Sequence, residues 1–515
     1  MVKKNTPQKT IAKKREPLTD SAEWSEALID AYFIEIEKIA KTYKLETYPH
    51  QIEIISSEQM LDAYASIGMP IGYNHWSFGK RFIHDEQQYK RGQMGLAYEI
   101  VINSNPCIAY LMEENTMLMQ ILVMAHACFG HNSFFKGNYL FKTWTDASAI
   151  VDYLLFAKNF IADCEEKYGV VEVEGLLDSC HALMNYGVDR YKRPDLSWRD
   201  EKELQKERAE HQQSMVNELW KTIPAELLKK RTRVDDNLFP SEPQENILYF
   251  IEKNAPLLKP WEREIVRIVR KIAQYFYPQK QTQVMNEGWA CFWHYTLMND
   301  LYDKGLINDG FMLEFLSSHT NVVFQPDFDS PYYSGINPYA LGFNMMMDIK
   351  RICCEPTEED KIWFPDIAGC DWLETLHFAM RNFKDESFIA QFLSPHLIRQ
   401  FKFFSVLDDE NESTLAISAI HEEQGYQDIR QKLSDQYNLS MNEPNIQVTQ
   451  VDLKGDRSLT LSYIPHNDIP LSESRHEVIK HLHRLWGFDV RLVQKTANGV
   501  EVIAACPLID EVIVA

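Results

Sequence analysis

Two short segments contain the residues whose types and spacing could bind a metal ion. Residues 124–131 read MAHACFGH and hold His126 and His131, while residues 285–290 read MNEGWA and hold Glu287. A close histidine pair combined with a distant glutamate is the ligand set of a large class of zinc sites. We therefore predict that these three side chains bind a divalent metal ion, with zinc as the expected element, and leave one position open for water.

The spacing of the histidine pair constrains the helix that carries it. In the common zinc-peptidase motif HExxH the histidines are at i and i+4 on one helical face, whereas His126 and His131 are separated by five positions. Five residues of an ideal α-helix turn the second side chain about 140° from the first. The pair can converge if the helix ends or bulges at Gly130, because a π-bulge re-aims the side chain that follows. The alternative is that core hydrogen bonds satisfy each histidine separately.

Glu287 stands near the start of an apolar stretch that predicts a buried helix. A buried carboxylate is costly unless it is paired or binds a cation. The MNEGWA phrase is similar to the segment that supplies the third ligand in glutamate zincins. The alternative is a carboxylate that is stabilised by the helix dipole alone.

One residue of a conventional zinc hydrolase is missing. In HExxH enzymes the glutamate after the first histidine is the general base that activates water, and Ala127 occupies this position. A replacement base must come from elsewhere in the chain, and the candidates are Glu113, Glu114, Asp163 and Glu165. The sequence therefore supports a metal site more strongly than it supports peptidase activity.

Four further polar side chains are candidates for the same site. His294 lies seven residues after Glu287, which places it on the same helix face but roughly 10 Å away, so we expect it to orient a ligand or face the substrate. His181 is a candidate catalytic residue or ligand, and Asp152 and Asp163 could orient the histidines. Core histidines and carboxylates paired with Arg or Lys are the alternatives.

The elements that must position these residues are mostly helices. Apolar residues at helical spacing predict helices over 21–43 (with an Asp20-Ser21 cap), 117–127, 147–167, 261–276 and 286–304. We predict a mainly α fold, with a basic flexible tail over 1–20 and a large helical, zincin-like core domain over 21–395. A charged, proline-containing excursion interrupts the core at about 190–245.

The last part of the chain has a different pattern. Short strands at 401–407 and 414–420 precede a helix at 424–436; strands at 447–453 and 458–464, a helix at 476–486 and strands at 489–494 and 500–505 follow. Asn498-Gly499 marks a hairpin turn between the last two strands. Residues 396–515 are therefore predicted to form a small α+β C-terminal domain.

Charge and composition limit the compartment and the partners. The 515 residues carry a formal net charge of -22, which disfavours nucleic acid and anionic membranes as partners. Basic clusters at 3–4, 13–15 and 229–233 are interpreted as solvated segments. The chain has no apolar run of about 18 residues that would span a membrane, and its basic N-terminus lacks the apolar segment of a signal peptide. Nine cysteines without CxxC spacing fit free thiols in the cytoplasm.

Four segments together resemble the SpoVR family, which is named for stage V sporulation protein R. They are HACFGHNSFFK at 126–136, residues 180–190 around His181, QKQTQVMNEGWACFWH at 279–294 and INPYALG at 336–342. The resemblance extends from about Trp24 to the C-terminus. It implies a role in a stress, stationary-phase or sporulation (spore cortex) system, with a PrkA-type serine protein kinase and its companion protein as partners. It implies no particular reaction.

The sequence is consistent with two different functions. The first is a metal-dependent amide or peptide hydrolase that lacks the usual HExxH glutamate. The second is a non-catalytic regulatory or scaffold protein with a degenerate metal site, which acts with the kinase through its C-terminal domain.

Overall fold

The structure is a computed structural model that describes most of the chain. The described residues are 16–66, 72–90, 99–189, 239–328, 330–403, 422–465, 471–496 and 499–507, with the short segments 203, 206–207, 406–407, 416–417 and 513–514. The three basic clusters, most of the charged excursion at 190–245 and the predicted turn residue Asn498 lie outside them.

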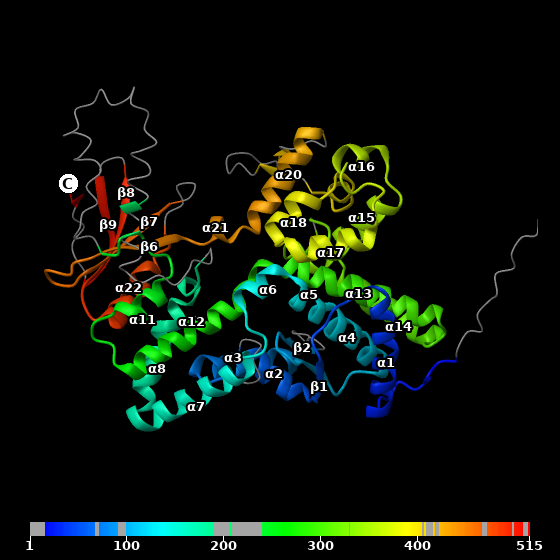
Figure 1. Cartoon of the computed structure of the whole chain (residues 1–515), viewed down its shortest axis with the longest axis horizontal. Coiled ribbons are helices and arrows are strands. Elements are labelled where there is room, and N and C mark those ends of the chain that lie inside the picture. The colour runs from blue at the N-terminus through cyan, green and yellow to red at the C-terminus, as the bar shows by residue number, and fades with distance from the viewer. Residues whose placement is uncertain are drawn as a thin grey trace, which may run out of the picture. The chain divides into compact units, whose positions relative to one another are not determined.

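The chain groups into two compact units (Figure 1). The first unit contains Met1–Gly72, Trp76–Leu155 and Pro278–Tyr437, and the second contains Tyr73–His75, Phe156–Tyr277 and Asn438–Ala515. The predicted ranges 1–20, 21–395 and 396–515 remain predictions about separately folding domains, whereas the compact units divide the chain at other points.

The first unit is mainly helical. Its helices are α1 Glu26–Thr42, α2 Ser57–Ala65, α3 Trp76–Lys90, α4 Met117–Met124, the π-helix η1 Ala125–His131, α5 Asn132–Gly137, α6 Tyr139–Trp144, α13 Gln283–Asp303, α14 Asp309–Val322, α15 Pro338–Cys354, α16 Glu358–Trp363, α17 Trp372–Asn382, α18 Asp385–Phe392, α19 Pro395–Gln400 and α20 Glu423–Gln436. Helices α7 (Ile150–Tyr168) and α12 (Pro260–Gln281) run from one unit into the other.

A three-stranded sheet, which the sequence did not predict, lies within this unit. Strands β1 (His50–Ile55), β3 (Cys107–Met112) and β2 (Glu99–Ile102) lie in the order β1-β3-β2, with β3 parallel to β1 and antiparallel to β2. Successive side chains of a strand point to opposite faces. Leu111 accordingly joins the main core, whereas Met112 joins a small cluster with α2. One face of the sheet therefore belongs to the large helical core, and η1 contacts β2 and β3.

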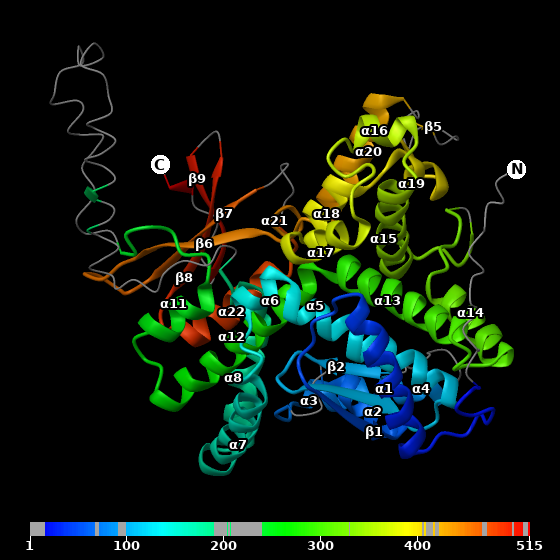
Figure 2. The same ribbon diagram turned by 45° about the vertical axis from the view of Figure 1, so that its right-hand side comes forward.

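Helix α13 packs against η1 and α15 at backbone distance, and Figure 2 shows it between α15 above and α4 below. A Cβ atom at Gly288 would overlap the backbone of Gly342 in α15, and a Cβ at Gly130 in η1 would lie 2.6 Å from the Cα of Ala290. Only glycine permits such close approach. These contacts hold the segment around Glu287 directly against the histidine-bearing helix.

The second unit combines helices with a five-stranded sheet. Its helices are α8 Val170–Ala182, the 3-10 helix η2 Met184–Tyr186, α11 Ile247–Asn254, α21 Leu439–Asn442 and α22 Arg475–Trp486. The sheet order is β10-β9-β8-β7-β6, from β6 Asn445–Val451, β7 Leu459–Ile464, β8 Val490–Thr496, β9 Gly499–Cys506 and β10 Ile513–Val514. Helix α22 connects the parallel pair β7 and β8 and packs against β8, β9 and α8.

The prediction of a mainly helical protein with a small C-terminal sheet is confirmed. The predicted start of the first helix at Asp20-Ser21 is wrong: α1 begins after Ser25, whose side chain accepts a hydrogen bond from the Leu28 N–H. Among the described residues of the predicted strands at 401–407 and 414–420, the short pair β4 (Val406–Leu407) and β5 (Ala416–Ile417) is formed, and residues 404–405, 414–415 and 418–420 lie outside the description. All nine cysteines are free thiols. Within the described ranges, no helix is long and apolar enough to cross a membrane.

Candidate metal centre

The histidine pair lies on a π-helix, and this explains how two side chains five residues apart can converge. The N–H of Asn132 donates to the carbonyl of Ala127, five residues earlier, and this is the bonding pattern of a π-helix. Residues five apart therefore stand on successive turns of the same side. The rings of His126 and His131 are 4.6 Å apart and nearly perpendicular. The predicted bulge around Gly130 is confirmed as the π-helix itself.

Glu287 reaches the same point from the second turn of α13. Its Oε2 atom lies 3.6 Å from Nε2 of His131 and 3.8 Å from Nε2 of His126. These distances exceed a hydrogen bond. Ligands held 2.0–2.2 Å from a tetrahedral ion are separated from one another by about 3.4 Å, so the spacing fits a shared ion.

The Oε2 atom of Glu287 is unsatisfied within the part of the chain that the structure describes. This atom is buried and accepts no hydrogen bond from a described residue. An unsatisfied buried carboxylate oxygen is costly, and a divalent cation would remove that cost. The donor set of two imidazoles and one carboxylate therefore fits a metal ion.

A second carboxylate, Glu99, lies at the same site. The Oε1 atom of Glu99 is 3.6 Å from Nε2 of His126, and Glu99, His126 and His131 form a group that could hold a metal ion. Glu99 begins β2, where it lies opposite Leu111 and hence faces η1. Sequence reasoning missed it because the strand was not predicted. The candidate bases Glu113 and Glu114 are exposed in the turn after β3.

The two carboxyl groups have pKa values shifted in opposite directions. Burial raises the pKa of Glu287, but the imidazoles of His131 and His126, with the Tyr339 hydroxyl, lower it below its ordinary value overall. Burial raises the pKa of Glu99, and the negative charge of Glu287 adds to this, so that it stays above its ordinary value despite His126. When the pKa values of two neighbouring carboxyl groups differ in this way, the group with the lower pKa can act as a charged ligand and the group with the higher pKa as a proton acceptor.

The two histidines also differ in pKa. Burial lowers the pKa of His126, but a hydrogen bond with Cys291 and the carboxylates Glu287 and Glu99 outweigh it and raise the pKa well above the ordinary value. Burial dominates at His131 and lowers its pKa, with the neighbouring His126 adding to the effect.

The Nδ1 atoms of both histidines are held by hydrogen bonds. Nδ1 of His131 lies 3.0 Å from Oδ1 of Asn286, to which it donates. Nδ1 of His126 lies 2.8 Å from Nδ1 of His294, whose Nε2 lies 2.7 Å from Nδ1 of His319. His294 therefore contacts the candidate ligand His126, and its ring also forms a possible metal-binding group with His126 and Cys291. Asn286 and His319 were not singled out in the sequence.

The INPYALG segment supplies a residue on the far side of Glu287. Asn337 caps α15 by accepting a hydrogen bond from the Tyr339 N–H, and the Tyr339 hydroxyl acts on the Glu287 carboxyl. Gly342 of the same segment is the contact with Gly288. The two phrases singled out in the sequence, MNEGWA and INPYALG, are thus two sides of one helix crossing.

The remaining predicted site residues are not grouped with the histidine cluster among the possible metal-binding groups of the described residues. His181, Asp163 and Glu165 belong to the second compact unit, whereas the cluster around His126 belongs to the first. Nε2 of His181 forms a 2.5 Å hydrogen bond with the Tyr73 hydroxyl. Asp163 is exposed on α7, and Glu165 has a pKa raised first by burial and then by Glu174. Asp152 is also exposed on α7. The structure does not group these side chains with the histidine pair.

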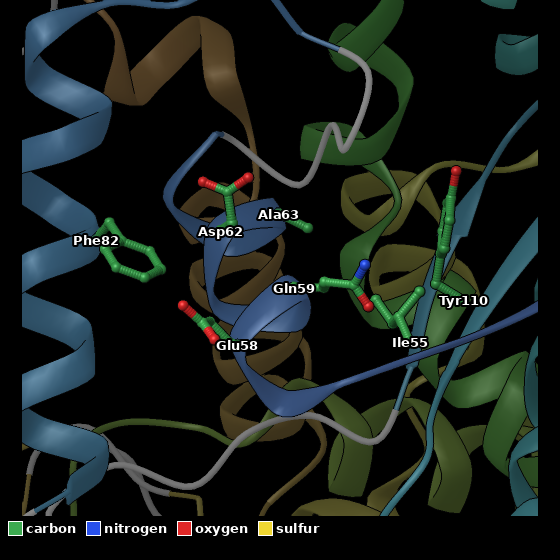
Figure 3. A pocket seen from close by; sticks show the side chains of 7 residues that line it. All are labelled: Ile55, Glu58, Gln59, Asp62, Ala63, Phe82 and Tyr110. Atoms are coloured by element: carbon green, nitrogen blue, oxygen red, sulfur yellow. The ribbon is translucent and has the colours of Figure 1, made fainter.

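A surface pocket lies on the opposite face of the three-stranded sheet. It encloses about 470 Å³ and is lined by Ile55, Glu58, Gln59, Asp62, Ala63, Phe82 and Tyr110. Figure 3 shows α2 in its middle, with Phe82 of α3 on one side and the strands on the other. Tyr110 alternates with Leu111, the partner of Glu99 in the register, so this pocket and the candidate metal centre are separated by the sheet.

Comparison with known proteins assigns the chain to a family. A family model described as SpoVR like protein matches residues 23–442, and one described as SpoVR-like C-terminal domain matches residues 444–497. The chain belongs to the SpoVR family. It is similar to the uncharacterized protein YcgB of Escherichia coli (strain K12), with 68% identity over 492 residues that cover 95% of this chain and 96% of that protein. No solved structure matches the chain.

Proposed function

We propose that this SpoVR-family protein is a metal-dependent hydrolase of amide or peptide bonds with a zincin-like centre. The observation that carries the proposal is the convergence of His126, His131 and Glu287 on one point, with separations of 3.6 and 3.8 Å to an Oε2 atom that has no hydrogen-bond partner among the described residues. Two imidazoles and a carboxylate with an open position are the ligand set of a catalytic zinc site.

The metal would supply the electrophile of the reaction. Bound zinc polarises a carbonyl group and lowers the pKa of a water molecule to about 7. His126 and His131 would hold it through Nε2, and Glu287 through Oε2. The mixture of nitrogen and oxygen ligands favours zinc among the common divalent ions, although other transition metals share these donors.

Glu99 takes the place of the absent HExxH glutamate in this proposal. Its carboxylate accepts a proton as the water oxygen bonds to the substrate carbonyl carbon, and it then gives that proton to the leaving amine nitrogen as the C–N bond breaks. The products are a carboxylic acid and an amine, so atoms and charge balance. The raised pKa of Glu99, caused first by its burial, suits a group that must gain and lose a proton.

Metal analysis of the purified full-length chain tests the ligand set. We expect about one zinc ion per chain in the wild type and none in H126A. H377A provides a matched control, because His377 is another buried histidine and donates to the Tyr43 carbonyl away from the site. A wild-type protein that holds no stoichiometric metal after growth and purification with zinc would overturn the proposal.

Activity separates the hydrolase from the second candidate, a scaffold whose metal serves only stability. Ala127 in the position of the usual base favours the scaffold, whereas Glu99 beside His126 favours the enzyme. We expect the wild type to cleave members of a peptide library in a chelator-sensitive manner. E99Q should keep its zinc and lose at least 100-fold in rate. Zinc binding with no cleavage by wild type would support the scaffold.

The physiological setting remains a prediction from the family resemblance. A stress, stationary-phase or sporulation role, a cytoplasmic location and a PrkA-type serine kinase with its companion protein as partners are expectations of this kind. Co-purification of the kinase with the full-length chain from cells in stationary phase is the direct test.

A further inference from the structure

Three buried histidines form a continuous hydrogen-bond chain that starts at the candidate metal centre. His126 of η1, His294 of α13 and His319 of α14 come from three different helices. The links join Nδ1 of His126 to Nδ1 of His294 at 2.8 Å, and Nε2 of His294 to Nδ1 of His319 at 2.7 Å. All three side chains are at least nine-tenths buried. The last ring lies two links away from the cluster of Glu99 and Glu287.

The chain can run in only two directions. A neutral imidazole has one N–H donor and one acceptor nitrogen, so the direction of one link fixes the next. In the forward direction His126 donates from Nδ1 to His294, and His294 donates from Nε2 to His319. In the reverse direction His319 donates first, and His126 is left with a proton on Nε2, the atom that faces the carboxylates.

Only the forward direction leaves a lone pair on Nε2 of His126. The neighbouring His131 has the same arrangement without ambiguity, because its Nδ1 lies 3.0 Å from the amide oxygen Oδ1 of Asn286, which can only accept. Its Nε2 is therefore free to bind. Two rings that offer Nε2 at one point require the His126 chain to run forward.

Aromatic packing fixes the ring planes along the chain. The ring of His319 lies edge-on to Phe343 at 4.7 Å and is tilted against Phe315 at 5.7 Å. His294 meets the ring of Phe315 edge-on at 6.0 Å and that of His319 edge-on at 5.0 Å. Rings that are confined in this way cannot exchange their two nitrogens by flipping without disturbing the core.

We propose that His294 and His319 are positioning residues that hold His126 in the tautomer with its proton on Nδ1. Their effect is to present the Nε2 lone pair toward Glu287 and His131. The choice of the forward direction and its use in metal binding rest on the proposed function, whereas the tautomer itself can be measured without zinc. Hydrogen bonds to the outer nitrogen of a metal-binding histidine typically change metal affinity by 10- to 100-fold.

Zinc affinity of the full-length protein, measured by competition with a chromophoric chelator, tests the links one by one. H294A removes both links and should weaken zinc binding by about 10- to 100-fold. H294N keeps an acceptor oxygen near Nδ1 of His126 but cannot reach His319. It should therefore weaken zinc binding as much as H319A does, and both losses should be smaller than the loss in H294A. Equal affinity in wild type and H294A would overturn the proposal.

H377A controls for general damage to α13. The ring of His377 contacts Trp289 and Trp293 of that helix without joining the chain. We expect it to lower the free energy of unfolding but to leave zinc affinity within about twofold of wild type. A loss in H377A as large as that in H294A would show that α13 packing explains the effect, and would count against the chain.

Nitrogen-15 NMR of histidine-labelled, metal-free protein reads the direction independently of zinc. We expect His294 and His319 each to carry their proton on Nε2, with assignments from H294A and H319A. Protons on Nδ1 of both rings would show the reverse direction and overturn the proposal even if zinc binds. Correct tautomers in a protein that never binds zinc would instead reject the proposed function and keep the chain. Two zinc ions per chain, one of them lost in both C291S and H294A, would replace the chain with a second metal site and overturn it.

Discussion

Gly288 has no side chain, and the close helix contact that this permits positions the preceding residue, Glu287. The backbone of α13 touches that of α15 at Gly288 and Gly342, and a Cβ on either residue would overlap the other helix. Glu287 is thereby held at a fixed depth between η1 and α15. The glycines of the two family phrases are therefore structural parts of the site, although they contribute no ligand.

G288A should destabilise the protein by about 3 kcal/mol, because overpacking at a backbone contact forces the helices apart. The free energy of unfolding in urea measures this, and metal content should fall as well. The matched control is G79A on α3, where a Cβ would meet nothing within 4 Å. It should stabilise by about 0.5–1 kcal/mol, because alanine is the better helix former. Equal effects of the two substitutions would contradict the packing argument.

The ligands could be read from the sequence because each stands in an apolar helix where a charge is conspicuous. His126, His131 and Glu287 fulfil that condition. Glu99 and His319 do not. Glu99 is a single polar residue in a short apolar segment, His319 stands in the polar run SSHTN at 317–321, and both reach the site only through tertiary packing. Without the strand pairing of β2 there is no reason to connect a glutamate at position 99 with a histidine pair that follows only after β3 and α4.

At the scale of elements, the N-terminus of α13 is capped by a side chain from another helix. Its N-cap residue Thr282 makes no side-chain capping bond. Instead, Asp385 of α18 accepts hydrogen bonds from the N–H groups of Val284 and Met285, both at 2.8 Å. The end of the helix that carries Glu287 is thus fixed by a buried carboxylate that comes from a hundred residues downstream.

D385A should destabilise by about 2–6 kcal/mol, because two buried N–H groups lose their acceptors at a cost of roughly 1–3 kcal/mol each. Urea unfolding measures the loss. The exposed cap D371A on α17 is the control, with a cost near 1 kcal/mol. A cost for D385A no greater than that of D371A would show that the buried cap is unimportant.

The pH dependence of stability should also report on Asp385. Burial raises its pKa to about 7 in the folded protein, although the backbone N–H groups of Met285 and Val284 lower it; in an unfolded chain the value is about 3.9. Between these values the folded state holds a proton that the unfolded state has lost, so this contribution to stability is complete below pH 4 and is lost as pH rises through 7. The difference in unfolding free energy between wild type and D385N should therefore decrease from pH 4 to pH 7. A constant difference would contradict the raised pKa.

Helices were predictable because long apolar repeats mark them. The runs at 117–127, 147–167, 261–276 and 286–304 each correspond to a helix of the structure. Strand β2 was missed because it has only four residues. Strand β3 is buried at nearly every position, so it lacks the alternation of polar and apolar residues that marks a strand in the sequence. The five-residue spacing of the histidines led to the π-helix because no α-helix brings both rings together.

At the scale of the whole molecule, all the candidate ligands belong to the first compact unit. Added zinc should therefore slow hydrogen exchange of the backbone amides at 124–132 and 283–294, because a ligand that binds only the folded state suppresses local opening. Amides of α22 and β8 in the second unit should be unchanged. Hydrogen-exchange mass spectrometry with and without zinc measures both, and H126A should abolish the response. Protection confined to the second unit would contradict the site.

The π-helix at Ala125–His131 also bears on how such a site can change over generations. Relative to an α-helix, a π-turn contains one additional residue, so removal of one codon between the two histidines would restore four-residue spacing and an α-helical turn. The converse insertion would produce the present arrangement from a standard zinc-binding helix while keeping both rings on one side. Pattern searches that require a fixed interval between ligands treat these two states as unrelated, yet a single three-nucleotide event separates them.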